Sequence, residues 1–129
     1  MPTQTDLSKT LPAETASAFA AVITSLEDAK AEEIVTIDIT GKSSIGDAMV
    51  VASGRSHRHV GAIADRLTRD LKEAGYGSAS VEGLPHCDWV LVDTGDVIIH
   101  IFRPEVREFY NIEKMWSVPS GQETVIANA

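Results

Sequence analysis

The chain has 129 residues, 43% of them hydrophobic, which predicts one globular domain with a single core. Its apolar runs are too short to cross a membrane, its N-terminus lacks a secretory pattern, and its one cysteine excludes an internal disulfide, so we expect a soluble cytoplasmic protein. A formal net charge of −8 argues against direct binding to nucleic acid and favours a basic protein as the partner.

The chain begins with a polar stretch and an amphipathic helix. Residues 1–11 show no periodicity, and we expect them to be disordered. From Pro12 apolar residues recur at three- and four-residue spacing, which predicts a helix over residues 12–31 with Pro12 in its first turn. We expect residues 12–116 to form the domain and residues 117–129 a flexible tail.

Two predicted strands and a second helix follow. Residues 33–40 alternate β-branched and polar side chains, and residues 48–53 form an apolar run, so each predicts a strand. Ser56 is suited to cap a helix whose apolar residues form one stripe from residue 60 to residue 74. Gly75 is expected to end this helix in a left-handed conformation.

A third strand over residues 78–82 precedes a predicted hairpin. Its two β-rich runs, residues 88–93 and 96–102, are separated by Thr94 and Gly95. A two-residue turn would give the pairs Asp93–Asp96, Leu91–Ile98 and Trp89–His100. A three-residue loop with a bulge would change these pairings.

Side-chain alternation divides the hairpin into two faces. The aliphatic face carries Val90, Val92, Val97, Ile99 and Ile101. It predicts a core face covered by a helix. The mixed face carries Trp89, Leu91, Asp93, Asp96, Ile98, His100 and Phe102. A simple interior layer would not need this mixture, so we interpret the mixed face as a recognition surface.

The last predicted element is a helix that begins at Pro104 and continues through Tyr110. Asn111 separates it from a final turn at residues 112–116. The element order α-β-β-α-β-β-β-α predicts a single α/β domain with a mixed five-stranded sheet flanked by helices.

The carboxylates Asp47, Asp93 and Asp96 are the candidates for a metal-dependent nucleotidyl or phosphoryl transferase. However, aspartates in turns usually accept local hydrogen bonds, and no nucleophile with an adjacent base accompanies these three. We therefore expect no enzymatic activity, no metal and no cofactor. Trp89 and Trp116 are better candidates, because tryptophan is enriched at binding hot spots, although partial burial in the core is the alternative.

Four segments, three of them long, carry a resemblance to a known family. They are IDITGKSSIGDAMVVASGRSHRHV at residues 37–60, VEG at residues 81–83, and DWVLVDTGDVIIHIF at residues 88–102 followed by REFYNIEKMW at residues 107–116. With these motifs the chain resembles the ribosomal silencing factors, also called Iojap-related proteins, over about residues 20–116.

The resemblance implies a nucleotidyltransferase-like fold without established transferase activity. Members of that family bind the large ribosomal subunit by docking on its ribosomal protein fourteen at the face where the subunits join. They thereby keep the small subunit from associating and repress translation when nutrients are scarce, and some assist ribosome biogenesis. For this chain, the resemblance implies the same partner and subunit anti-association.

The resemblance also implies site residues. The implied partner-binding set is Trp89, Val90, Leu91, His100, Tyr110, Glu113, Lys114 and Trp116. Ser44 and Asp47 lie where related transferases keep part of their catalytic loop. Asp47 is followed by Ala48 and Met49, so the paired acids of an active transferase are missing.

Three hypotheses follow. The first is an anti-association factor that acts by binding alone. The second is the metal-dependent transferase that uses Asp47, Asp93 and Asp96. The third is a homodimer formed through the mixed face of the hairpin.

Overall fold

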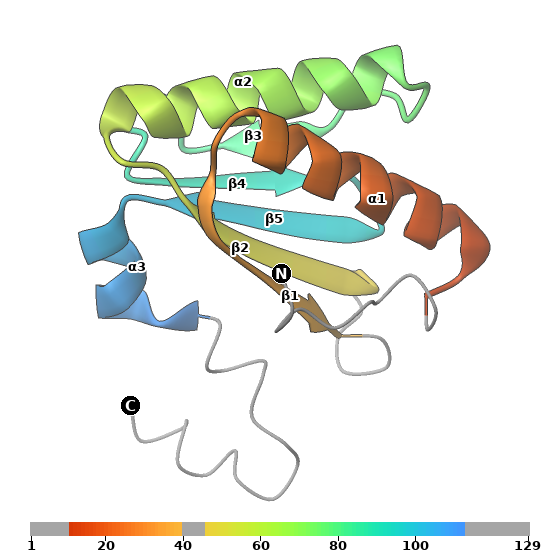
Figure 1. The fold of residues 1–129 in the computed structure, drawn as a ribbon, viewed down its shortest axis with the longest axis horizontal. Helices are drawn as coiled ribbons and strands as arrows, with labels where there is room; N and C mark the ends of the chain where they lie inside the picture. Colours follow the sequence, from red (N-terminus) through yellow and green to blue (C-terminus); the bar gives the residue numbers. More distant parts are fainter. Residues whose placement is uncertain (1–10, 40–45, 113–129) are drawn as a thin grey trace, which may run out of the picture.

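The computed structural model describes residues 11–39 and 46–112 of the chain. Within them the elements are α1 (Ala13–Asp28), β1 (Glu32–Asp38), β2 (Ala48–Ser53), α2 (His57–Glu73), β3 (Ser80–Glu82), β4 (Trp89–Asp93), β5 (Val97–Phe102) and α3 (Pro104–Tyr110). Their order and types confirm the predicted sequence of elements (Figure 1).

The five strands form one mixed sheet in the order β1-β2-β5-β4-β3. The β2–β5 pair is parallel, and the other neighbours are antiparallel. This arrangement confirms the predicted α/β class. Every residue of β2 and β5 is buried, as expected for central strands that are covered on both faces.

Helices α1 and α2 lie side by side and cover one face of the sheet (Figure 1). The core beneath them contains the five residues predicted for the aliphatic face of the hairpin, namely Val90, Val92, Val97, Ile99 and Ile101. It also contains the buried stripe of α2, which includes Ile63 and Leu67. The helix-covered core face is therefore confirmed.

Helix α2 begins and ends at the predicted residues. The side chain of Ser56 accepts a hydrogen bond from the backbone N–H of His59 at 3.1 Å, so it caps the first turn. After the helix, Gly75 adopts a φ of +93°, and the Tyr76 N–H donates to the Leu71 carbonyl at 2.9 Å. These bonds satisfy carbonyl groups that the end of a helix would otherwise leave unpaired.

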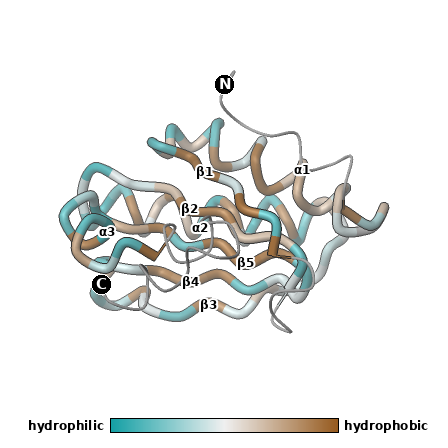
Figure 2. Tube along the Cα trace, turned by 90° about the horizontal axis from the view of Figure 1, so that it is seen from below, coloured by the Kyte–Doolittle hydropathy of each residue, from teal (hydrophilic) through white to brown (hydrophobic). Residues whose placement is uncertain are grey.

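The opposite face of the sheet holds a second, smaller core. It consists of Ile37, Ile39, Met49, Val51 and Phe102, against which Trp89 and Val106 pack. Val106 belongs to α3, which lies at the end of the sheet where β5 finishes (Figures 1 and 2). The mixed face of the hairpin is therefore only partly a surface. This corrects the interpretation of the whole mixed face as a recognition surface, because α3 folds back and Val106 packs against the cluster that contains Phe102.

The hairpin has a different register from the predicted one. The observed pairs are Asp93–Ile98, Leu91–His100 and Trp89–Phe102. Residues 94–96 connect the two strands. The Thr94 hydroxyl accepts from the N–H of Val97, the first residue of β5, at 3.1 Å, and the Asp93 carboxylate accepts from the Gly95 N–H at 2.8 Å. The predicted two-residue turn is wrong, but the shift equals two residues, so the assignment of side chains to faces remains correct.

Candidate protein-docking surface

Five aromatic rings form a continuous series from the sheet interior to solvent, which we call the ring row. Its members are Phe102, His100, Trp89, Tyr110 and Phe109. Centroids of contacting rings are 4.8 to 5.9 Å apart. Phe102 is completely buried and His100 is 8% exposed, whereas Tyr110 is 51% and Phe109 80% exposed. The outer rings are thus supported by rings that the sheet holds in place.

The strand order and α3 bring these rings together. Trp89 on β4 lies opposite Phe102 on β5, and the Trp89 ring also contacts the Tyr110 ring of α3 with centroids 4.8 Å apart. Pro104 occupies the first turn of α3, where its lack of an N–H costs no hydrogen bond. The left-handed Asn111, with a φ of 53°, ends this helix as the sequence predicted.

Two polar contacts attach α3 to the sheet. The Arg103 backbone N–H donates to the Asp88 carbonyl at 3.0 Å, and the Arg103 Nε donates to the Asp88 carboxylate at 2.9 Å. The hydrogen bond from Arg103, and to a smaller extent the one from His57, lowers the pKa of Asp88. Further along α3, Arg107 donates to the Ser53 hydroxyl at 2.7 Å. These contacts join α3 and the residue before it to the start of β4 and to the end of β2.

Trp89 and His100 form a buried polar contact within the ring row. The Trp89 indole N–H donates to Nδ1 of His100 at 2.9 Å. Burial lowers the pKa of His100 to about 4, so its imidazole is neutral at pH 7. Since Nδ1 accepts, the single imidazole proton is on Nε2.

Gly83, in the VEG motif, lies against the backbone of Trp89. Its φ is +94°, and a Cβ at this position would lie 2.3 Å from the Trp89 carbonyl oxygen. Only glycine fits here without a shift of the backbone. Sequence reasoning noted this glycine as part of a motif but did not find its role, which depends on a contact across the sheet.

The structure separates the implied partner-binding residues by burial. Trp89 and Leu91 are half-buried and Tyr110 is exposed, so these three can contact a partner. The side chain of Val90 is completely buried in the core under the helices, which corrects the expectation that it contacts a partner. His100 is almost completely buried and contacts Trp89 instead. Glu113, Lys114 and Trp116 lie outside the described residues.

Phe109 is the residue that sequence reasoning missed. It is the most exposed of the large hydrophobic side chains in the part of the chain that the structure describes. Its ring meets the Tyr110 ring edge-on at a centroid distance of 5.0 Å. An aromatic residue in a short amphipathic helix resembles a core residue in sequence, and only the observation that α3 has no fully buried residue shows the difference.

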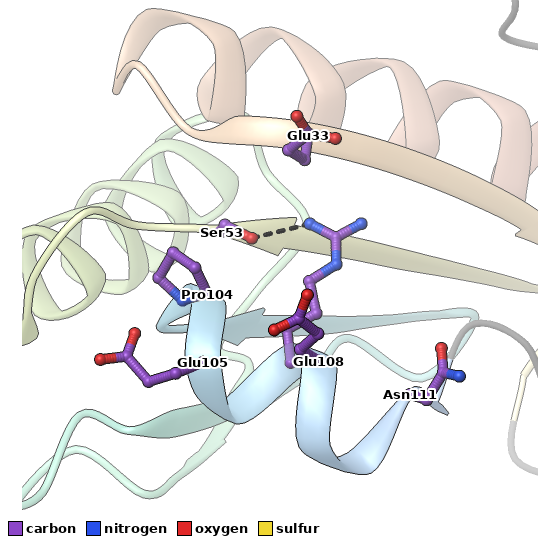
Figure 3. Close-up of a pocket in the computed structure, with 7 residues that line it drawn as sticks. Glu33, Ser53, Pro104, Glu105, Glu108 and Asn111 are labelled. Atoms are coloured by element: carbon purple, nitrogen blue, oxygen red, sulfur yellow. Dashed lines mark hydrogen bonds between the residues drawn. The ribbon is translucent and has the colours of Figure 1, made fainter.

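A pocket of about 540 Å³ lies beside the ring row, along α3 (Figure 3). Its lining residues are Glu33, Ser53, Pro104, Glu105, Arg107, Glu108 and Asn111. The lining therefore carries three carboxylates and one guanidinium; the guanidinium donates to Ser53, and Glu105 is paired with Arg103 at 2.8 Å. The surface next to the ring row is acidic, which is complementary to a basic partner.

Two of the three carboxylates proposed for transferase chemistry, Asp47 and Asp93, have structural contacts. Asp47 accepts a hydrogen bond from the Thr15 hydroxyl at 3.1 Å, and Asp93 accepts from the backbone of the hairpin turn. Among residues 11–39 and 46–112, no group of three or more His, Cys, Asp or Glu side chains is arranged to hold a metal ion. Ser44 lies outside the described residues. The transferase hypothesis therefore has no support.

The helices in the described part of the chain are also too short or too polar to cross a bilayer.

Comparisons with known proteins give a consistent result. A family model described as ribosomal silencing factor during starvation matches residues 12–128. The chain is 58% identical over 95 residues to the ribosomal silencing factor of Zymomonas mobilis, covering 74% of this chain and 71% of that protein. It is 32% identical over 102 residues to the mouse protein named mitochondrial assembly of ribosomal large subunit protein 1, covering 77% of this chain and 45% of the mouse protein. A crystal structure of a Chromobacterium violaceum protein is similar with a TM-score of 0.75 and 36% identity, covering 83% of this chain and 95% of that chain.

Proposed function

The chain belongs to the ribosomal silencing factor family, and on that premise we propose that it represses translation by binding the large ribosomal subunit and blocking the small subunit from joining. The proposed contact is large-subunit ribosomal protein fourteen, at the face where the subunits meet. The name of the mouse relative, which refers to assembly of the mitochondrial large subunit, supports the choice of particle. The proposed place of action is the cytoplasm.

The observation that carries the proposal is the exposed end of the ring row. Tyr110 and Phe109 lie side by side and are 51% and 80% exposed. Aromatic side chains provide much of the binding energy at protein interfaces, and rings that are already held in place lose little conformational freedom on binding. Trp89 supports Tyr110 from beneath and is half-buried itself.

Charge supports the choice of a basic partner. The formal net charge of −8 favours encounter with a positively charged surface, and the acidic pocket is lined largely by α3, the helix that carries Tyr110 and Phe109. The proposed mechanism needs no chemistry, because a folded domain bound at the joining face occupies the space that the small subunit requires.

The proposal is tested by sedimenting the protein with isolated small and large subunits. We expect it to accompany the large subunit and to remain in the supernatant with the small one. Equal recovery with both particles, or with neither, would contradict the proposal. Addition of the small subunit to the preformed complex should leave the subunits separate.

A further inference from the structure

We infer that His100 is a positioning residue: its Nδ1 accepts the one hydrogen bond that the Trp89 indole can donate, so Trp89 presents a partner with a ring and no hydrogen-bond donor. This inference rests on the proposed function and assigns a role within the same surface. It predicts which chemical groups of the partner can lie against Trp89 and explains what holds the Trp89 ring in place.

The geometry explains why the acceptor is fixed. His100 lies on β5, a central strand, and pairs with Val51 of β2 on one side and Leu91 of β4 on the other. Its imidazole stacks on the buried Phe102 ring with an interplanar angle of 9°. A ring held by two neighbouring strands and by stacking cannot follow a moving indole, so the indole takes its position from the histidine.

The hydrogen bond uses the whole polar capacity of Trp89. An indole has one N–H donor and no acceptor, and this donor lies 2.9 Å from Nδ1 of His100. The low pKa of His100, which burial lowers to about 4, keeps the accepting lone pair available at neutral pH. What remains accessible of Trp89 is apolar, so we expect the partner to place an aliphatic or aromatic group against it and not an acceptor oxygen.

The orientation of Trp89 also determines the position of Tyr110. The two rings are in contact, with centroids 4.8 Å apart, and Tyr110 in turn contacts Phe109. If the indole lost its acceptor, it would turn toward water to satisfy its N–H and would displace the rings above it. His100 is 8% exposed, so its effect on binding is transmitted through Trp89 and not through direct contact.

Two substitutions separate this role from a general effect on folding. His100→Asn keeps an oxygen near the place of Nδ1 but leaves a cavity, whereas His100→Leu fills the space without an acceptor. The first measurement is exchange of the Trp89 indole proton with solvent by NMR. The other indole resonance belongs to Trp116, and Trp89→Phe identifies which one is lost. We expect slow exchange in the wild type and His100→Asn, and exchange at least tenfold faster in His100→Leu.

The second measurement is the affinity of the same variants for isolated large subunits. We expect His100→Asn to bind within about threefold of the wild type and His100→Leu about tenfold more weakly, the effect of one ordinary hydrogen bond. A purely structural role predicts that affinity follows stability. As a control, Ile98→Ala creates a cavity on the same strand and face, and it should lower stability while leaving indole exchange and affinity unchanged.

The outcomes distinguish this inference from the proposed function. If the wild type binds large subunits and His100→Leu binds equally well, the inference is overturned and the proposed function stands. If the indole exchanges rapidly in the wild type, the inference is overturned by that result alone. If the wild type does not bind large subunits, the proposed function fails, and the role of His100 in binding fails with it.

Discussion

Asp88 and Arg103 close the open end of the hairpin and determine where the chain enters α3. Asp88 precedes β4 and Arg103 follows β5, and they are joined by a backbone hydrogen bond of 3.0 Å and a side-chain hydrogen bond of 2.9 Å. His57, at the start of α2, donates to the same carboxylate at 2.8 Å. One residue, Asp88, therefore connects three elements next to the ring row.

Removing the side-chain half of this contact should loosen α3. Arg103→Gln retains the backbone hydrogen bond but loses the guanidinium that binds Asp88, so we expect faster amide exchange in α3 and several-fold weaker binding to large subunits. Stability should change little, because partly exposed ion pairs contribute little. Arg66→Gln is the matched control, since Arg66 pairs with Asp28 and Asp70 on the helical side of the molecule. Equal effects of both variants on binding would contradict the role of Arg103.

Phe109→Ala should weaken binding and leave the fold intact. The side chain is 80% exposed, so the free energy of unfolding should change by no more than about 0.5 kcal/mol. The affinity for large subunits should fall about tenfold or more, as is usual for an aromatic anchor. Tyr76→Ala provides the control, because Tyr76 is 38% exposed but lies beside Ser17 of α1. Unchanged affinity of Phe109→Ala for large subunits would show that Phe109 is not part of the docking surface.

The buried imidazole of His100 should make stability depend on pH. Its folded-state pKa is about 4, below the value near 6.5 of an exposed histidine, so the folded state binds this proton more weakly than the unfolded state. The contribution of His100 to the free energy of unfolding is complete above about pH 6.5. It is lost as the pH falls toward 4, a loss of about 3 kcal/mol. Urea denaturation at pH 7 and pH 4.5 measures the effect. The loss should be smaller in His100→Asn, and equal losses in both proteins would contradict the assignment.

Gly83→Ala should destabilise the fold more than Gly95→Ala. Both glycines have a positive φ, which costs a non-glycine residue about 1 kcal/mol. At Gly83 the new Cβ would also lie 2.3 Å from the Trp89 carbonyl oxygen, whereas at Gly95 it would meet nothing within 4 Å. We expect a total loss of at least about 2 kcal/mol at Gly83 in urea denaturation, because the backbone must shift as well. Similar losses for the two variants would mean that the close approach is relieved without cost.

The negative charge of the acidic pocket should speed association with the large subunit. Glu108→Lys reverses a charge in the pocket lining, and we expect slower association with large subunits and a weaker dependence of the association rate on salt. Glu73→Lys makes the same change at the end of α2, away from the pocket, and should have a smaller effect. Stopped-flow association at two salt concentrations compares them. Equal effects of the two variants would show that only the overall charge matters and would contradict a specific contribution of the pocket.

Most of the fold was predictable from the sequence because the decisive information is local. Ser56 and Gly75 mark the ends of α2 through their side-chain chemistry and conformational freedom, and the apolar run at residues 48–53 coincides with β2. The two faces of the hairpin were assigned correctly despite a wrong turn, because the register differs by an even number of residues. The wrong pairing arose from Thr94, whose hydroxyl closes a longer connection.

The candidate surface was only partly predictable, because burial depends on contacts between distant elements. Trp89 and Tyr110 were identified, but Val90 proved to be buried under the helices and His100 beneath Trp89. Nothing local to Phe109 indicates that it is exposed. That result depends on how α3 folds back after Pro104.

The most direct test of the account is the joining of purified small and large subunits, followed by light scattering while the protein is added. With the wild type, we expect the fraction of joined ribosomes to fall as the large subunit is occupied, and Phe109→Ala should need at least about tenfold more protein for the same effect. Normal joining at a wild-type concentration that saturates the large subunit would contradict the central claim.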